Sequence, residues 1–306
     1  MSGWFLLDNF IAVLGLKGAV APTDSHLSGE QIEADIAYAD SVVRNYCKHG
    51  AATGRVAEIG PGGSALTGLM LIDRGAERVE LLDRFAYAHS QSALDRAYAL
   101  TIGRSDRLRE LFPRPADLAP RIEFATGEAA AAERYFLDHS GYDSICSCAV
   151  FEHLMDPIAA LEGAASALNP GGIMVHYVDF RDHGMYTAGG AHELTFLKVP
   201  GWLYPSMSRA RGRPNRVLID QYRAACDALD LDYRILATSL VGVGSIDETP
   251  VDEIPADLRA RANARVLEIR DRLASPFRDM PVDDLAIEGI ALVAHRKSLP
   301  EAVSQR

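Results

Sequence analysis

The chain has 306 residues, of which 48% are hydrophobic, and its formal net charge is −11. This length and composition allow a large buried core, so we expect one large α/β domain with extensions, or a domain and a half. The acidic balance argues against a nucleic-acid or anionic-membrane partner, because no basic stripe is present that could hold a phosphate backbone.

An apolar segment and a helix come first in chain order. Residues 4–16 are mostly apolar but too few to span a bilayer, so no transmembrane segment is expected. They also lack the flanking residues of a signal peptide, so none is expected. Three roles stay open for this segment: a helix packed on the domain, a homodimer contact, or a peripheral membrane attachment. A helix from Gly29 to about Lys48, capped by Ser28, is predicted by apolar residues at helical spacing, namely Ile32, Ile36, Val43 and Tyr46.

A glycine-rich turn follows the first predicted strand. The apolar run that begins at Val56 carries Glu58 and breaks at Gly60 and Gly62, after which residues 65–72 are expected to be helical. Glycines in such a turn let a ligand approach the backbone, and the free N–H groups of the helix N-terminus point at it. The next apolar run ends at Asp83, which could accept hydrogen bonds from ribose hydroxyls. This order of elements predicts a nucleotide-type site.

The form of the turn favours a cofactor without a pyrophosphate. Its spacing is acid-x-Gly-x-Gly from Glu58 to Gly62, and Ser64 stands where a third glycine is often found. Adenosylmethionine carries a cationic amino group and a sulfonium, and an acid before the turn suits these charges. At this point the chain resembles the class I S-adenosylmethionine-dependent methyltransferases, whose first motif has this form.

The resemblance continues down the chain in the family's order. Residues 121–128, 141–157 and 169–179 are similar to the third, fourth and fifth strands of the family with their turns. Residues 285–297 are similar to its final antiparallel strand. The resemblance implies a Rossmann-like α/β fold: a mostly parallel seven-stranded sheet with helices on both faces, an N-terminal helix and substrate-cover insertions. We expect an N-terminal helical segment at residues 1–48 and a cofactor-binding core at 49–180. A substrate-cover insertion is expected at 181–216. The C-terminal part of the core should follow at 217–300, with a helical insertion near 247–283.

The substrate-cover insertion is interpreted as a lid. It is rich in glycine, and Phe196, Trp202 and Tyr204 would offer apolar surface that closes over a bound acceptor. The alternative is an extension that is permanently packed on the domain. Arg209, Arg211, Arg213 and Arg216 form a basic cluster within it, which is either a solvated loop or a site for an anionic substrate group.

The resemblance places S-adenosylmethionine across the strand tips. The residues that it implies as cofactor-binding are Glu58, Gly60, Pro61, Gly62, Asp83, Arg84, Gly127, Glu128 and Ala149. Other roles stay open: the glycines could serve only the turn, Asp83 could cap a helix, and Glu58 could accept structural hydrogen bonds. Likewise, Glu128 could be a helix N-terminal charge and Ala149 could be plain core.

Methyl transfer to a hydroxyl requires alignment of the acceptor and removal of its proton, which favours a nearby histidine or carboxylate. His183 is the predicted base, and Asp182 or another acid could fix its tautomer. His153 is either a second base or a residue that shapes the pocket. Asp179 and His192 are further candidates. No metal ligand is assigned. A magnesium site built from Glu152, Asp179 or Asp182 is the alternative, without a diagnostic spacing.

We therefore expect an enzyme that methylates a hydroxyl oxygen of a small molecule or saccharide. N-methylation of a small molecule and a non-catalytic adenosylmethionine-binding subunit remain alternatives. A nicotinamide oxidoreductase would need a third glycine at the turn, which the chain lacks. Four cysteines without a paired framework suit a reducing cytoplasm.

Overall fold

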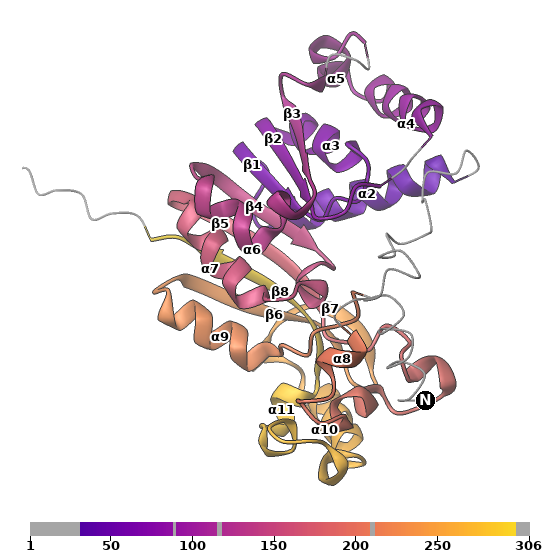
Figure 1. Cartoon of the computed structure of the whole chain (residues 1–306), viewed down its shortest axis with the longest axis vertical. Coiled ribbons are helices and arrows are strands. Elements are labelled where there is room, and N and C mark those ends of the chain that lie inside the picture. The colour runs from indigo at the N-terminus through magenta and orange to yellow at the C-terminus, as the bar shows by residue number, and fades with distance from the viewer. Residues whose placement is uncertain (1–30, 88–89, 115–117, 209–211, 298–306) are drawn as a thin grey trace, which may run out of the picture.

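The computed structural model describes residues 31–87, 90–114, 118–208 and 212–297, which form one sheet with helices on both faces (Figure 1). The strands are β1 (Gly54–Ile59), β2 (Ala76–Asp83), β3 (Ile122–Thr126), β4 (Tyr142–Cys148), β5 (Leu168–Asp179), β6 (Asp232–Leu240), β7 (Gly244–Pro250) and β8 (Ile287–His295). The helices are α2 (Ile32–Lys48), α3 (Leu66–Arg74), α4 (Gln91–Gly103), α5 (Asp106–Leu111), α6 (Ala132–Asp138), α7 (Pro157–Ala167), α8 (Pro205–Ser208), α9 (Ile219–Ala228), α10 (Ala256–Leu267) and α11 (Val282–Leu285). Short 3₁₀ helices lie at Glu128–Ala130, Phe151–His153, Thr187–Gly189, Glu193–Lys198, Val251–Glu253, Arg270–Arg272 and Phe277–Asp279.

The sheet has the strand order β3-β2-β1-β4-β5-β8-β6-β7. Strands β1 to β6 run in the same direction, whereas β8 lies antiparallel between β5 and β6, and β7 is antiparallel to β6. This confirms the mostly parallel Rossmann-like sheet and the final antiparallel strand. Because the first five strands are parallel, their carboxyl ends meet at one edge.

The sheet has eight strands, so the predicted number of seven is wrong. The additional strand is β7, which pairs with β6 as a hairpin and occupies the start of the region expected to be a helical insertion. Gly242 and Gly244 both have positive φ angles, 68° and 90°, and allow the tight reversal between the two strands. The expected helix follows as α10, which buries Ala262 and Val266.

The N-terminal helix forms as its pattern predicts. α2 begins at Ile32, and the four apolar residues of the pattern, Ile32, Ile36, Val43 and Tyr46, are buried against the sheet. The apolar segment 4–16, Ser28, Arg209 and Arg211 lie outside the described residues, so what was predicted for them stays a prediction. Among the residues that are described, no helix combines the length and the apolar character needed to cross a bilayer.

A polar network ties three neighbouring strands together. Glu80 on β2 is 3% exposed, and its carboxylate accepts hydrogen bonds from Arg55 on β1 and from Tyr142 on β4, at 2.7 and 2.5 Å. Tyr135 on α6 donates a further bond at 3.1 Å. Burial alone would raise the pKa of Glu80, but the bonds from Tyr142 and Arg55 hold it below its ordinary value. These hydrogen bonds therefore offset the cost of burying the Glu80 carboxylate.

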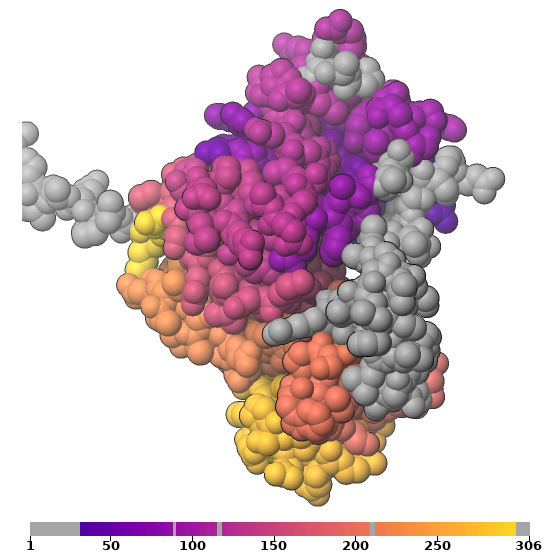
Figure 2. Space-filling model, viewed as in Figure 1, coloured from indigo at the N-terminus to yellow at the C-terminus, as the bar shows by residue number. Residues whose placement is uncertain are grey.

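The insertion at 181–216 is packed into the core, which corrects the lid interpretation. Phe196 and Tyr204 are 1% and 2% exposed and belong to the same apolar cluster as β8 and α9. Because both rings are already buried, they cannot gain by closing over an acceptor. Trp202 is 80% exposed. Figure 2 shows the α8 region lying directly against the C-terminal segment, coloured yellow. The backbone bond from Ala274 N–H to the Leu197 carbonyl, 3.1 Å long, joins these two segments.

Phe196 and Trp202 give a direct test of this packing. Phe196→Ala should lower the free energy of unfolding by about 3 kcal/mol, the usual scale for emptying a buried aromatic site. Trp202→Ala is the matched control and should change it by less than about 0.5 kcal/mol, because that side chain is exposed. Urea unfolding followed by circular dichroism measures both values. If both substitutions changed the free energy of unfolding equally little, the result would instead support an insertion that opens freely.

Candidate active site

The glycine turn after β1 has two residues with left-handed backbone. Gly60 has φ +71°, its N–H donates to the Leu82 carbonyl at 2.7 Å, and an added Cβ would meet Val150 at 2.4 Å. Gly62 has φ +72°, but an added Cβ there would meet nothing within 4 Å. Close packing against Val150 therefore requires glycine at position 60. At position 62 glycine is favoured only by the left-handed backbone conformation. The Gly62 side of the turn is open to the approach of a ligand.

Glu58 precedes this turn on β1 as a buried carboxylate. Its side chain is 2% exposed, and Oε1 accepts a hydrogen bond from the Tyr46 hydroxyl at 3.1 Å. Oε2 has no hydrogen-bond partner of ordinary geometry among the described residues. Burial raises the pKa of Glu58 to about 7, and the hydroxyls of Thr67 and Tyr46 offset only part of that rise. A cation placed beside Oε2 would favour the charged form.

Asp83 ends β2 at the same edge of the sheet. It is 7% exposed, and Oδ1 accepts a hydrogen bond from the Phe85 N–H at 2.8 Å. Burial raises its pKa to about 6, and the backbone N–H groups of Phe85 and Gly62 offset part of that rise. The acid predicted for the tip of the second strand therefore lies beside the glycine turn.

The predicted cofactor residues near β3 are held by ion pairs and by the backbone. Gly127 has φ +91° and donates its N–H to the Asp83 carbonyl at 3.1 Å. The Arg84 guanidinium pairs with Glu133 at 3.1 Å and with Glu128 at 3.6 Å. The Glu128 side chain is 73% exposed. These pairs give Arg84 and Glu128 a structural role beside the site, and their contact with a cofactor stays a prediction.

Ala149 holds a strained backbone conformation where β4 ends. It is exposed, its φ is +55°, and its N–H donates to the Tyr177 carbonyl of β5 at 2.9 Å. A left-handed non-glycine residue costs roughly 1–2 kcal/mol. Such strain gathers at ligand-binding sites, where the surrounding structure enforces it. The observation agrees with the predicted place of Ala149 at the site.

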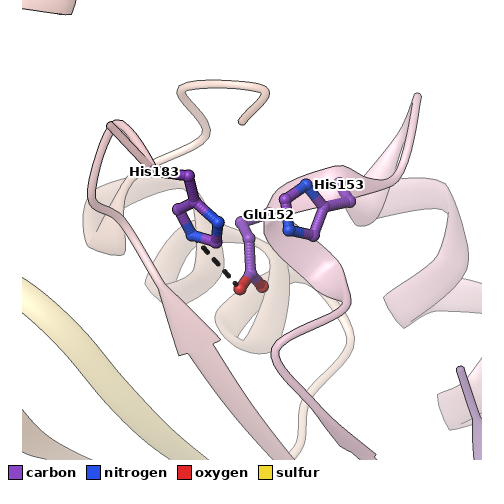
Figure 3. A group of neighbouring side chains, drawn as sticks. All are labelled: Glu152, His153 and His183. Atoms are coloured by element: carbon purple, nitrogen blue, oxygen red, sulfur yellow. Dashed lines mark ion pairs between the residues drawn. The ribbon is translucent and has the colours of Figure 1, made fainter. Parts of the chain in front are cut away.

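Three polar side chains meet beyond β4 and β5. Glu152 and His153 lie on the 3₁₀ turn after β4, and His183 lies on the loop after β5 (Figure 3). The distance from His183 Nε2 to Glu152 Oε1 is 3.8 Å, and the two imidazole rings are perpendicular with centroids 4.7 Å apart. The two predicted histidines are thus brought together. From the sequence, Glu152 is a candidate only in the magnesium alternative, and the Glu-His pair at 152–153 is the signal that could have indicated its role.

Asn215 holds the turn that carries this cluster. Its side-chain amide donates to the carbonyls of Phe151 and Leu154, at 2.7 and 3.0 Å, and its backbone N–H donates to the Glu152 carbonyl at 2.7 Å. Asn215 lies in the 181–216 insertion, so that insertion fixes the shape of the turn. The sequence does not indicate a role for this residue, because a lone asparagine in a loop carries no signal of its partners.

Burial dominates the electrostatics of the cluster. Glu152 is 2% exposed and burial raises its pKa to about 8, although the backbone N–H groups of Glu152 and Asp179 counter part of the rise. Burial and the neighbouring His183 lower the pKa of His153 to about 4. Burial also lowers the pKa of His183, against the opposing effect of Asp179.

Asp182 is a structural residue, which corrects its predicted catalytic role. It is 1% exposed and accepts hydrogen bonds from the N–H groups of Gly184, Tyr186 and Thr187 and from the Thr187 hydroxyl. A carboxylate has about four acceptor sites, and these donors take them all. The acids within 4 Å of the His183 ring are instead Asp179 and Glu152.

The remaining histidine and acid candidates are engaged elsewhere. His192 bonds to the Arg265 carbonyl at 2.8 Å and to the Leu194 N–H at 3.1 Å, so it holds the insertion together. His176 is fully buried beside Ser147, and burial lowers its pKa to about 3, as expected of a core histidine. Asp179 is paired with the Arg181 guanidinium.

A cavity of about 310 Å³ opens beside His153. Asn215 and Ser208 line it together with two cations, Arg213 and Arg216. The Arg216 guanidinium lies over the Tyr204 ring at 3.8 Å, and burial lowers its pKa to about 10. The cavity thus joins the polar cluster to the insertion.

The sequence matches the family model described as a methyltransferase domain over residues 32–232. This span contains the glycine turn, Asp83 and the cluster of Glu152, His153 and His183. The chain belongs to the methyltransferase domain family. It is an S-adenosylmethionine-dependent methyltransferase, as the resemblance in the sequence implied. No curated protein matches the sequence.

Solved structures with similar folds include other methyltransferases. A Galdieria sulphuraria protein provisionally named a sarcosine dimethylglycine methyltransferase is 14% identical with a TM-score of 0.45, covering 88% of this chain and 87% of its own. The YcgJ protein of Bacillus subtilis is 13% identical with a TM-score of 0.42, covering 87% and 100%. Haemonchus contortus phosphoethanolamine N-methyltransferase 2, solved with phosphomonomethylethanolamine and S-adenosylhomocysteine, is 12% identical with a TM-score of 0.43, covering 90% and 59%. Similarity this low says nothing about the acceptor of this methyltransferase.

The raised pKa of Glu58 predicts how stability depends on pH. The folded state holds the Glu58 proton up to about pH 7, whereas the unfolded chain releases it near pH 4.3. Between these values the folded state binds more protons, so this group's contribution to stability is present at low pH and is lost as the pH rises.

Glu58→Gln removes this contribution while keeping an acceptor for Tyr46. Relative to the wild type, the variant should therefore gain on the order of 3 kcal/mol in unfolding free energy from pH 4 to pH 8. Urea unfolding at both pH values measures the difference. A difference between the two proteins that does not change with pH would show that Glu58 ionises normally in the fold.

Proposed function

We propose that this methyltransferase acts on a hydroxyl oxygen of a small-molecule or saccharide acceptor. The proposal is carried by the cluster of Glu152, His153 and His183 at the edge of the sheet where the glycine turn and Asp83 also lie. A hydroxyl must lose its proton as it attacks, and imidazole and carboxylate groups are the side chains that assist this step. An amine acceptor can bind already deprotonated and would need no such cluster.

The strand tips suit S-adenosylmethionine. The open side of Gly62 admits a ligand to the backbone, and the unpartnered Oε2 of Glu58 suits the cationic amino group. Asp83 would accept hydrogen bonds from the ribose hydroxyls. The bound cofactor supplies a methyl group activated by its sulfonium. In this arrangement Gly60 and Pro61 complete the turn, and Gly127 and the Ala149 backbone lie at the neighbouring strand tips.

The cavity beside His153 is the proposed acceptor pocket. Its polar lining by Ser208, Asn215 and Arg213 suits an acceptor with several oxygen atoms. Arg216 bonds to the carbonyls of Phe196 and Val199, and its guanidinium lies over the Tyr204 ring. A half-buried cation of this kind supports an acceptor that carries an anionic group. The cavity meets the cluster at His153, and the cluster would handle the acceptor proton.

A radiolabelled methyl-transfer screen tests the acceptor class. The purified chain would be incubated with S-[methyl-³H]adenosylmethionine and with paired acceptors that differ only in hydroxyl or amino groups, including anionic sugars and phenolic acids. Label should appear on hydroxyl-bearing members. Label confined to the amines would show an N-methyltransferase. Cofactor binding by calorimetry without any transfer would favour a non-catalytic binding subunit.

Asp83→Ala tests the cofactor site. The variant should weaken S-adenosylmethionine binding by about 1–3 kcal/mol, because buried hydrogen bonds to the ribose are lost. Isothermal titration calorimetry measures the loss, and Glu123→Ala on the exposed part of β3 is the control. Equal affinity in wild type and Asp83→Ala would show that the ribose lies elsewhere.

His183→Ala tests the cluster. The variant should slow methyl transfer by about 10²-fold or more while its affinity for S-adenosylmethionine stays near normal, because the side chain serves the acceptor proton and not the cofactor. His139→Ala, an exposed histidine at the end of α6, is the control and should retain full turnover. Unchanged turnover of His183→Ala on a hydroxyl acceptor would remove this residue from the reaction.

A further inference from the structure

The Glu152 carboxylate is buried, and only the backbone N–H groups of Glu152 and Asp179 partly offset the cost of its burial. It is 2% exposed, and within the described part of the chain neither oxygen has a hydrogen-bond partner of ordinary geometry. Glu80 is equally buried but receives hydrogen bonds from Arg55, Tyr135 and Tyr142. Folded proteins rarely leave a buried carboxylate without a donor or a cation, because its desolvation costs several kcal/mol. Glu152 is therefore short of a positively charged partner.

Two imidazoles flank this carboxylate. One ligand atom each from Glu152, His153 and His183 lies within 4.8 Å of the other two, and Figure 3 shows the carboxylate between the two rings. Ligand atoms on one Zn²⁺ lie about 2.1 Å from the ion and hence about 3.4 Å from one another. Small side-chain rotations would bring the three ligand atoms to the separation that a bound ion requires. Two imidazoles and one carboxylate form a donor set typical of transition-metal sites.

The hydrogen bond of His153 leaves a nitrogen free to bind a metal. Its Nδ1 lies 2.6 Å from the Gly212 carbonyl oxygen, which can only accept, so Nδ1 carries the proton. In the neutral ring the lone pair is then on Nε2. Metal-bound histidines commonly donate their second N–H to a carbonyl or carboxylate, which fixes the tautomer and the orientation of the ring.

His183 is held in place from its own loop. Its φ is +48°, a left-handed conformation that Asp182 supports by bonding to the N–H groups of the next residues, Gly184 among them. The carboxylate of Asp179 lies 3.6 Å from His183 Nε2, but the Arg181 guanidinium already holds it. Glu152 is thus the acid near this ring that no guanidinium holds among the described residues.

We propose that Glu152, His153 and His183 bind a divalent transition-metal ion, such as Zn²⁺, Mn²⁺, Fe²⁺ or Co²⁺. Three protein ligands leave coordination positions open for a substrate oxygen. Magnesium is disfavoured because it selects oxygen ligands, and because Asp182 and Asp179, its other predicted ligands, are already bonded. This inference rests on the proposed function: the open positions would take the acceptor hydroxyl and lower its pKa, as metal ions do for bound water.

Metal binding can be measured without any acceptor. The full chain, prepared without a histidine tag and stripped with EDTA, would be titrated with Zn²⁺, Mn²⁺ and Mg²⁺ by calorimetry, and Co²⁺ binding would be followed by its visible absorption. We expect one transition-metal ion per chain and much weaker Mg²⁺ binding. Glu152→Gln and His183→Ala should each weaken binding by at least ~10-fold, whereas His139→Ala should bind like the wild type.

The outcomes separate this inference from the proposed function. Unchanged metal affinity in both variants, or no binding by the wild type, would overturn the metal site; S-adenosylmethionine affinity and circular dichroism would confirm that the variants are folded. Transfer to a hydroxyl that survives EDTA would overturn the role of the metal in lowering the pKa of the hydroxyl and leave His183 as a general base, with the proposed function intact. Metal binding that is lost in the variants, in a protein that methylates only amines, would support the site and reject the proposed function.

Discussion

The parallel pairing of β1 with β2 and β4, and of β4 with β5, is the constraint on which the site depends. It brings the carboxyl ends of these strands to one edge. The pairing continues into the turns, because Gly60 N–H bonds to the Leu82 carbonyl and Ala149 N–H bonds to the Tyr177 carbonyl. Both turn residues take positive φ angles, so the chain turns sharply beyond the sheet and exposes its backbone to a ligand.

Buried acids have two different roles in this protein. Glu80 receives bonds from β1, from β4 and from α6, and it stabilises the sheet away from the strand tips. Glu58 and Glu152 lie toward the carboxyl ends of β1 and β4, and each has at least one oxygen without a partner among the described residues. Burial raises the pKa of both. An acid kept in this state is suited to a cationic partner, which is an amino group at Glu58 and a metal ion at Glu152 in our proposals.

The insertion after β5 contributes both to the apolar core and to the turn that carries the polar cluster. It contributes Phe196 and Tyr204 to the core, and its Asn215 holds the turn that carries Glu152 and His153. The proposed acceptor pocket is therefore shaped by a segment that also contributes to the core. Changes in acceptor specificity are then expected at exposed lining positions of this segment, such as Gly201, and not at its buried rings.

The sequence by itself determined the strand–turn–helix order, the cofactor class, the apolar face of α2 and the two histidines of the cluster, because each depends on local spacing or on residues next to a strand end. The tertiary structure decided what depends on contacts between distant segments. These are the eighth strand, the burial of Phe196 and Tyr204, the saturation of Asp182 by its loop, and the meeting of Glu152 with His183 across 31 positions of sequence. The physical reason is that periodicity shows which residues are apolar, whereas only the packed chain shows which polar groups find partners.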